Sequence, residues 1–156
     1  MNLDYQNFLD TLTSETNKLG IDISEFTLDH VAYQTKSSGE YDLLVPEFKK
    51  IADLVREATV GGRRVGVFKF KISPVYSNSP IKAIELIEPK EGQVCESGLE
   101  HAEYVPSMSL EDILIKYPSI NWNKDNINRA EFPMLILRLS ENMQVKFPRG
   151  SVLSQG

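Results

Sequence analysis

The chain has 156 residues, of which 41% are hydrophobic and 25% charged, and it carries a net charge of −5 with no dense basic run, so we expect one globular domain and no nucleic-acid partner. Its single cysteine, Cys95, excludes an intrachain disulfide and a cysteine-rich zinc site, which favours a cytoplasmic location. No stretch approaches the roughly 20 apolar residues of a membrane span, and the acidic N-terminus is unlike a secretory signal, so we expect no membrane partner.

The first 24 residues are predicted to form a helical cover over the rest of the domain. The apolar residues that would share one side of this helix are Tyr5, Phe8, Leu9, Leu12 and Leu19. Residues 26–35 follow with the alternating pattern of a strand. A second helix is expected over residues 41–58, ended by Gly61 and Gly62. The residues that it would bury are Leu44, Phe48, Ile51 and Val55.

Strands are predicted along much of the remaining chain. They cover residues 63–72, 81–89, 99–105, 132–139 and 143–147. A short helix capped by Ser109 is expected between the third and fourth of these strands, followed by an irregular segment over 120–130. The polar, glycine-bearing stretch at 88–98 is the best candidate for a connection between two halves.

An internal repeat is the most informative feature of the sequence. Residues 28–33, Leu-Asp-His-Val-Ala-Tyr, match residues 99–104, Leu-Glu-His-Ala-Glu-Tyr, and both histidines of the chain lie in this repeat. Each copy opens a half that continues with a helix and then strands. We therefore predict an α+β fold in which two βαβββ modules, residues 25–92 and 93–150, form a curved mixed sheet around a cleft, with the N-terminal helix as an addition.

Three metal-binding side chains are predicted to point into this cleft. In the strand at 81–89, Glu85 is the only charge in an otherwise apolar row, because residues two apart share a face of a strand. A carboxylate there is costly to desolvate unless it is paired or bound to a cation. His30 and His101 occupy matching places in the repeat, so the three groups would share one space.

Two imidazoles and one carboxylate suit a divalent ion such as Zn, Fe, Mn, Ni or Co, with open positions for a substrate. Gln144, taken as the counterpart of Glu85 in the second half, is a candidate for a weaker fourth ligand, and Glu85 is also the candidate catalytic base. In the alternative, the backbone satisfies both histidines and Glu85 pairs with a lysine or arginine. The two interpretations stay open at this point.

Two cations are candidates for binding a substrate. Arg138 interrupts an apolar strand and would clamp a carboxylate if it faced inward, and Lys146 has the same possibility in the last strand. The alternative for both is an ordinary solvent-exposed side chain.

Several segments resemble the YecM family, whose members resemble the vicinal oxygen chelate superfamily of glyoxalase I and extradiol dioxygenases. The segments are DHVAYQT (29–35), GGRRVGVFKF (61–70), IELIEPKEG (84–92), GLEHAEYV (98–105), NRAEFP (128–133) and VKFP (145–148). The resemblance implies paired βαβββ modules around a metal-binding cleft, with His30, Glu85 and His101 as ligands. The chain departs from the pattern at Pro148, where the family would continue to a histidine, and in having Gln144 or Lys146 in place of a fourth acidic ligand.

Two functions fit these features. The first is a metal-dependent isomerase, lyase or oxygenase that acts on a small oxygenated substrate. The second is a protein that binds or sequesters a small molecule in the same cleft without turning it over. For either function we expect a monomer or a homodimer with a small-molecule ligand.

Overall fold

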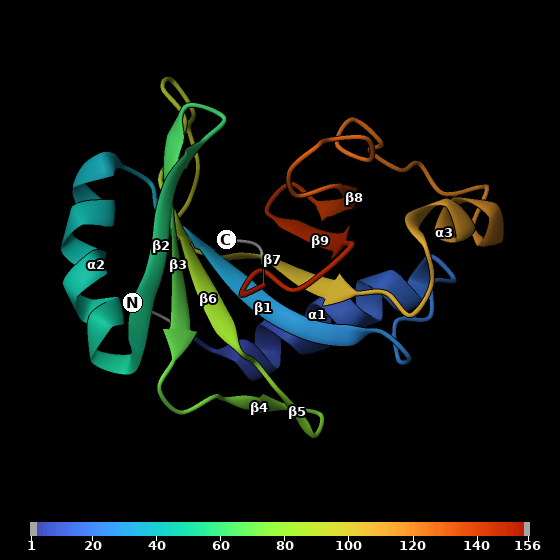
Figure 1. The fold of residues 1–156 in the computed structure, drawn as a ribbon, viewed down its shortest axis with the longest axis horizontal. Helices are drawn as coiled ribbons and strands as arrows, with labels where there is room; N and C mark the ends of the chain where they lie inside the picture. Colours follow the sequence, from blue (N-terminus) through green and yellow to red (C-terminus); the bar gives the residue numbers. More distant parts are fainter. Residues whose placement is uncertain (1–2, 155–156) are drawn as a thin grey trace.

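The computed structural model describes residues 3–154, which form a seven-stranded mixed sheet with helices packed on it (Figure 1). The helices of this range are α1 (Tyr5–Lys18), α2 (Ser38–Ile51) and α3 (Leu110–Lys116). The sheet strands are β1 (Thr27–Gln34), β2 (Ala52–Val60), β3 (Arg63–Phe70), β6 (Ala83–Ile87), β7 (Gly98–Val105), β8 (Met134–Ser140) and β9 (Met143–Pro148). β4 (Val75–Tyr76) and β5 (Ser79–Pro80) form a separate two-stranded hairpin.

Two similar halves meet at the centre of the sheet, whose strand order is β2-β3-β6-β1-β7-β9-β8. β1 and β7 pair antiparallel, while β6 runs parallel to β1 and β9 runs parallel to β7. The first half has the order β1-α2-β2-β3-β6. In the second half, β7-α3-β8-β9, a single bridge between Asn123 and Ile136 lies where a further strand would be. The predicted α+β class with a large mixed sheet and an added N-terminal helix is confirmed.

The N-terminal helix covers one face of the sheet as expected. The Asp4 side chain caps α1 by accepting a hydrogen bond from the Asn7 N–H at 3.1 Å. Phe8 and Leu12 are buried in the core, whereas Leu19 is 44% exposed. The prediction for Leu19 is wrong because the helix ends at Lys18 and the chain turns away there.

The predicted helix over residues 41–58 is wrong in its second part. α2 ends at Ile51, and the next nine residues form the edge strand β2 instead. Phe48 is fully buried, but Ile51 and Val55 are 37% and 51% exposed. The helical spacing of these apolar residues therefore continued by chance into a strand whose side chains are alternately half-buried and exposed.

A tight turn explains why this segment is a strand. Gly61 and Gly62 have φ values of 59° and 81°, the left-handed conformation that two-residue hairpin loops require. They join β2 to β3 in an antiparallel hairpin that pairs Val60 with Arg63. The two glycines thus turn the chain between strands instead of ending a helix.

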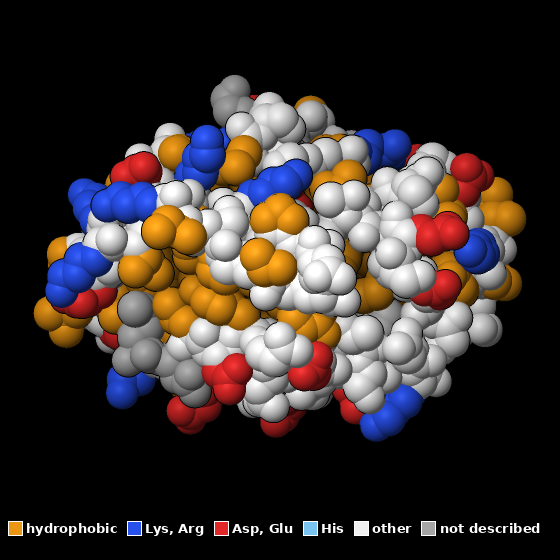
Figure 2. Space-filling model, turned by 90° about the horizontal axis from the view of Figure 1, so that it is seen from below, with side chains coloured by type: hydrophobic (Ala, Val, Ile, Leu, Met, Phe, Trp, Pro, Cys, Tyr) orange, Lys and Arg blue, Asp and Glu red, His pale blue; other side chains and the backbone are white. Residues whose placement is uncertain are grey.

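The predicted strands at 63–72, 81–89, 99–105, 132–139 and 143–147 are all present, with ends shifted by a few residues. The cap of α3 is also as predicted, because the Ser109 hydroxyl accepts a hydrogen bond from the Asp112 N–H at 3.0 Å. No helix within residues 3–154 is both long and apolar enough to cross a membrane. Seen from below, the molecule carries a band of hydrophobic side chains with charges of both signs around it (Figure 2).

A network of ion pairs around Arg64 of β3 connects helix α2 to the end of β6 in the first half of the sheet. The Arg64 guanidinium donates hydrogen bonds to Glu88 at 2.8 and 3.1 Å and to Asp42 at 2.8 Å. The hydrogen bonds from Arg64 lower the pKa of Glu88 to about 2. The guanidinium also lies 4.4 Å from the centre of the Tyr41 ring.

Replacing Glu88 with glutamine is expected to lower the free energy of unfolding by about 1–2 kcal/mol at pH 7, since Arg64 is partly screened by solvent. A carboxylate with a depressed pKa stabilises the fold above pH 4.5, and this contribution is lost as the pH falls toward 2. Urea unfolding should therefore show a smaller difference in stability between the native protein and Glu88→Gln at pH 2.5 than at pH 7. Glu47→Gln, which removes an exposed pair with Lys50, is the control and should change little. A constant difference at both pH values would contradict this prediction.

Candidate metal centre

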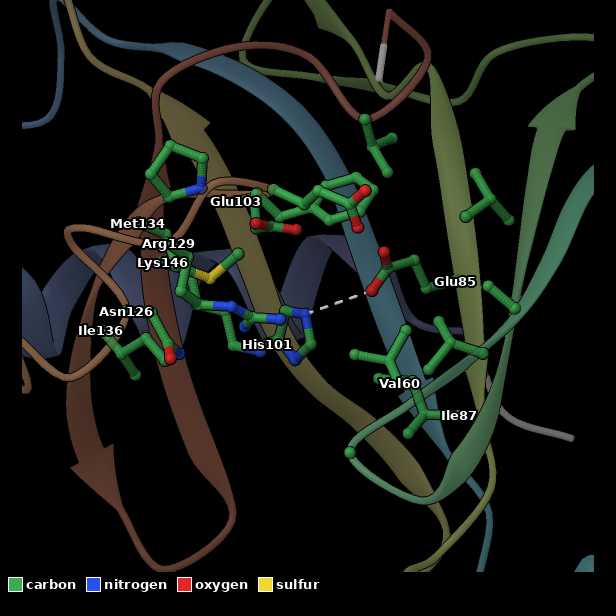
Figure 3. A pocket seen from close by; sticks show the side chains of 18 of the residues that line it. Val60, Glu85, Ile87, His101, Glu103, Asn126, Arg129, Met134, Ile136 and Lys146 are labelled. Atoms are coloured by element: carbon green, nitrogen blue, oxygen red, sulfur yellow. Dashed lines mark ion pairs between the residues drawn. The ribbon is translucent and has the colours of Figure 1, made fainter. Parts of the chain in front are cut away.

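Four ionisable side chains meet on the concave face of the sheet because of the register of its three central strands. His30 on β1 lies opposite Glu103 on β7, and two residues further Ala32 lies opposite His101. On the other side of β1, Ala32 pairs with Glu85 of β6. Figure 3 shows Glu85, His101 and Glu103 directed into one space.

The ligand atoms of His30, Glu85, His101 and Glu103 all lie within 4.8 Å of one another. Glu85 bridges the two imidazoles, with one carboxylate oxygen 3.6 Å from His30 Nε2 and the other 3.5 Å from His101 Nε2. Glu103 Oε2 contacts His30 Nε2 directly. Both Nε2 atoms are buried and make no hydrogen bond of normal geometry with any described residue. This set of atoms has the spacing and the unsatisfied nitrogens that a bound cation would use.

The other nitrogen of each ring is held by the acidic residue directly before the histidine. His30 Nδ1 lies 2.8 Å from Asp29 Oδ2, and His101 Nδ1 lies 2.5 Å from Glu100 Oε2. A carboxylate on one nitrogen directs the other toward the centre, as is usual for histidines that bind metals. The acidic residue in each copy of the repeat therefore serves to orient the imidazole of the histidine that follows it.

The C-terminal segment is tied to this network. The Val152 N–H donates to Asp29 Oδ2 at 2.9 Å, and Val152 packs on Val67 and Ala83 beside the cluster. Asp29 is thus held from two sides, by an imidazole and by a backbone amide. Burial alone would raise the pKa of Asp29, but these hydrogen bonds lower it below its ordinary value.

Opposite charges compensate one another at the centre of the cluster. Burial alone would lower the pKa of His30, but the carboxylates of Glu103 and Glu85 raise it well above its ordinary value. Burial would likewise raise the pKa of Glu85, and the facing imidazoles hold it well below its usual range. Without a metal, a protonated imidazole therefore supplies the positive charge between the carboxylates.

His101 has a more mixed environment than His30. Burial and the nearby Lys146 ammonium both lower the pKa of His101, whereas Glu100 raises it, and the result lies above the ordinary value. Burial would raise the pKa of Glu100, but the His101 imidazole opposes this and the pKa is about 2.

The structure brings together His30, Glu85 and His101, the three residues that the sequence predicts. The alternative is not observed, because neither imidazole bonds to the backbone and Glu85 has no lysine or arginine partner among the described residues.

Glu103 is the member of the cluster that sequence reasoning missed. It lies two residues after His101, and the period of a strand places both on one face. That spacing alone would have identified it. The repeat hid it, because the matching residue of the first copy is Ala32.

The predicted equivalence of Gln144 with Glu85 is wrong. His30 pairs with Ala83, and its counterpart His101 pairs with Gln144. Two residues further, Glu85 therefore corresponds to Lys146, which pairs with Glu103. In the first half the carboxylate of the cluster, Glu85, lies on the last strand, β6. In the second half the carboxylate, Glu103, lies on the first strand, β7. Gln144 lies beside His101 at the edge of the cluster.

A cavity of about 1130 Å³ opens over the cluster, between the two halves of the sheet. Lys146 lines this cavity (Figure 3). Arg138 does not; it lines a neighbouring hollow of about 500 Å³, where its guanidinium donates to the carbonyl oxygen of Glu141 at 3.0 Å.

Comparisons with known proteins agree with this architecture. The family model described as YecM protein matches residues 1–150. Protein YecM of Escherichia coli (strain K12) is 24% identical over 102 residues, a match that covers 65% of this chain and spans only 54% of the relative's length.

Two solved structures share the fold. The structural-genomics protein EC4020 has a TM-score of 0.77 at 19% identity, with 95% of this chain and 85% of that chain covered. The hypothetical protein BH1468 from Bacillus halodurans C-125 has a TM-score of 0.54 at 16% identity, covering 80% of this chain and 94% of that one.

Proposed function

The chain belongs to the YecM family, and we propose that its buried cluster binds one divalent metal ion and presents it to a small oxygenated ligand. The ligands would be His30 and His101 through Nε2 and Glu85 and Glu103 through their carboxylates. The observation that carries the proposal is that four such atoms lie within 4.8 Å of one another, while both Nε2 atoms make no hydrogen bond of normal geometry with any described residue.

The chemistry of the donor set supports a divalent ion of the Zn, Fe, Mn, Ni or Co group. Imidazole and carboxylate together suit these ions, and two ionised carboxylates with two neutral imidazoles would balance a charge of +2. Asp29 and Glu100 support the proposal independently, since each fixes its neighbouring histidine with Nε2 toward the centre.

The paired arrangement of the halves supports a finer proposal, a site of the vicinal oxygen chelate type. Ions of this group commonly take five or six donors, so four protein ligands would leave room for two neighbouring oxygens of a substrate. A bound ion of this kind would polarise those oxygens as a Lewis acid. Glu85, which is ionised and 14% exposed, is the group that we propose for proton transfer in an isomerase, lyase or oxygenase reaction.

Calorimetric titration with Co²⁺ tests the ligand set. Glu85→Gln, His101→Ala and Glu103→Gln should each weaken binding by at least about tenfold, or roughly 1.4 kcal/mol, because each removes one charged or strongly donating ligand. Glu131→Gln is the matched control, because Glu131 lines the same cavity outside the cluster and should leave the affinity unchanged.

The proposal is wrong if the three cluster variants bind Co²⁺ as tightly as the native protein. It is equally wrong if the Glu131 variant loses as much affinity as they do, since the ion would then bind at the cavity mouth. Circular dichroism of every variant shows whether it is folded at the temperature of the titration.

A further inference from the structure

The cavity over the cluster collects positive charge from an acidic chain. Six of the 17 Lys and Arg residues line it, but only three of the 22 Asp and Glu residues do. The lining cations are Arg56, Arg63, Lys90, Arg129, Lys146 and Arg149. Two of the three acids, Glu85 and Glu103, belong to the cluster, and Glu131 is the third. With Glu85 and Glu103 neutralised by a divalent ion, Glu131 would be the one charged acid left in the lining of the cavity.

Some of these cations have structural partners. Arg149 pairs with Glu111 at 2.7 Å, and the Arg56 guanidinium lies 5.3 Å from the centre of the Phe132 ring. These two therefore have roles in holding the segments around the cavity.

Other cations form no ion pair. Within residues 3–154, the side chains of Arg129 and Lys146 make no hydrogen bond or ion pair, although the Lys146 ammonium lies near enough to Glu100 to lower the pKa of that carboxyl. Arg63 Nε is buried and also unpaired, although the same guanidinium donates weakly to Gln34 at 3.4 Å. Unpaired cations that share a partly enclosed space repel one another and attract an anion. A negatively charged ligand would supply the counter-charge that they lack.

The positions of two of these cations relate them to the cluster. Lys146 pairs with Glu103 across β7 and β9, so it is a direct neighbour of the proposed metal ligands. Arg129 comes from the loop before β8 and points into the same space (Figure 3). Apolar side chains, among them Val60, Ile87 and Ile136, line the walls and would contact a short carbon skeleton.

We propose that the ligand of this cavity is a small organic dianion. One end carries two neighbouring oxygens that meet the metal, and the other end carries a carboxylate or phosphate that Arg129 and Lys146 bind. This inference rests on the proposed metal site. The size of the cavity and its apolar walls favour a small molecule over a polyanion, and the outer face in Figure 2 mixes both signs of charge.

Three probes test the contributions of the two ends of the ligand separately. 2-Oxopentanoate, 2-oxopentanedioate and 2-oxo-4-phosphonobutanoate offer the metal the same oxygens, but only the last two carry a second anionic group. Calorimetry on the Co²⁺-loaded native protein should show at least one of these two binding about tenfold or more tightly than 2-oxopentanoate. The phosphonate stands in for a phosphate, so the tighter of the two acids identifies the second group as a carboxylate or a phosphoryl group.

Two variants assign the effect to the cations. In Arg129→Gln and in Lys146→Gln, the affinity for the tighter dianion should exceed the affinity for 2-oxopentanoate by less than about threefold. Lys146→Gln should bind Co²⁺ as well as the native protein or better, because a positive charge beside the metal is removed. Lys69→Gln, which removes an exposed lysine of β3 that does not line the cavity, should keep the full advantage.

The outcomes distinguish the two proposals. Equal binding of all three acids to protein that holds Co²⁺ would overturn the dianion proposal and leave the metal site standing. A dianion advantage that survives in both cavity variants would overturn the assignment to Arg129 and Lys146. Failure of the native protein to bind Co²⁺ would overturn the metal site and, with it, this inference.

Discussion

Replacing His30 with alanine is expected to destabilise the metal-free protein by about 3–5 kcal/mol, the range for breaking a buried ion pair. The imidazole lies between Asp29, Glu85 and Glu103, and it is fully buried. Its loss would leave Asp29 and Glu103 without their imidazole partner, and Glu85 with His101 alone. Urea unfolding of the chelator-treated protein at pH 7 measures the effect.

His101→Ala provides the comparison. Its hydrogen-bonded acid, Glu100, is 24% exposed and can be solvated by water, whereas Asp29 is only 1% exposed. The loss of stability for His101→Ala should therefore be clearly smaller than for His30→Ala. A loss of less than about 1 kcal/mol for His30→Ala would show that the charges around it are not coupled as described.

Metal affinity is expected to fall by more than about a hundredfold between pH 8 and pH 5. Metal binding requires neutral imidazole, so protons and metal compete for each histidine. The carboxylates of Asp29, Glu85 and Glu103 raise the pKa of His30 well above 6.5, so the proton competes already at neutral pH. His101, between Glu100 and Lys146, also has a raised pKa and adds to the loss in acid.

Calorimetry over this pH range, in two buffers of different ionisation enthalpy, gives both the affinity and the number of protons released. At least one proton should leave for each Co²⁺ bound at pH 7. An affinity that is flat from pH 8 to pH 5 would contradict a site built from imidazoles. It would point instead to carboxylates alone.

The site could be largely predicted from the sequence because its main parts repeat. His30 and His101 recur 71 residues apart on two central strands, and the alternation of a strand assigns Glu85 to the inner face. These arguments need only local periodicity and a repeated motif. They are therefore available without knowledge of how the strands pair.

Gln144 shows where this reasoning ends. Both Gln144 and Glu85 lie four residues before a proline, Pro148 and Pro89, so the sequence favours their equivalence. Strand pairing decides otherwise, because the register of β9 on β7 places Lys146 at the position of Glu85. Register is a property of the assembled sheet, and a shift of two residues leaves the pattern of each strand unchanged.

The strand β2 was missed for a related reason. The spacing of Leu44, Phe48, Ile51 and Val55 continues the period of α2. The same segment forms a strand because β3 is available to pair with it after the Gly61-Gly62 turn. Tertiary pairing overrides the local pattern here, and the turn residues were the signal for it.

Diffraction from crystals soaked in Co²⁺, measured at the cobalt absorption edge, tests the central claim most directly. The account predicts one strong anomalous peak at about 2.0–2.3 Å from the Nε2 atoms of His30 and His101 and from carboxylate oxygens of Glu85 and Glu103. The absence of a peak among these four residues, in crystals that bind cobalt elsewhere, would contradict it.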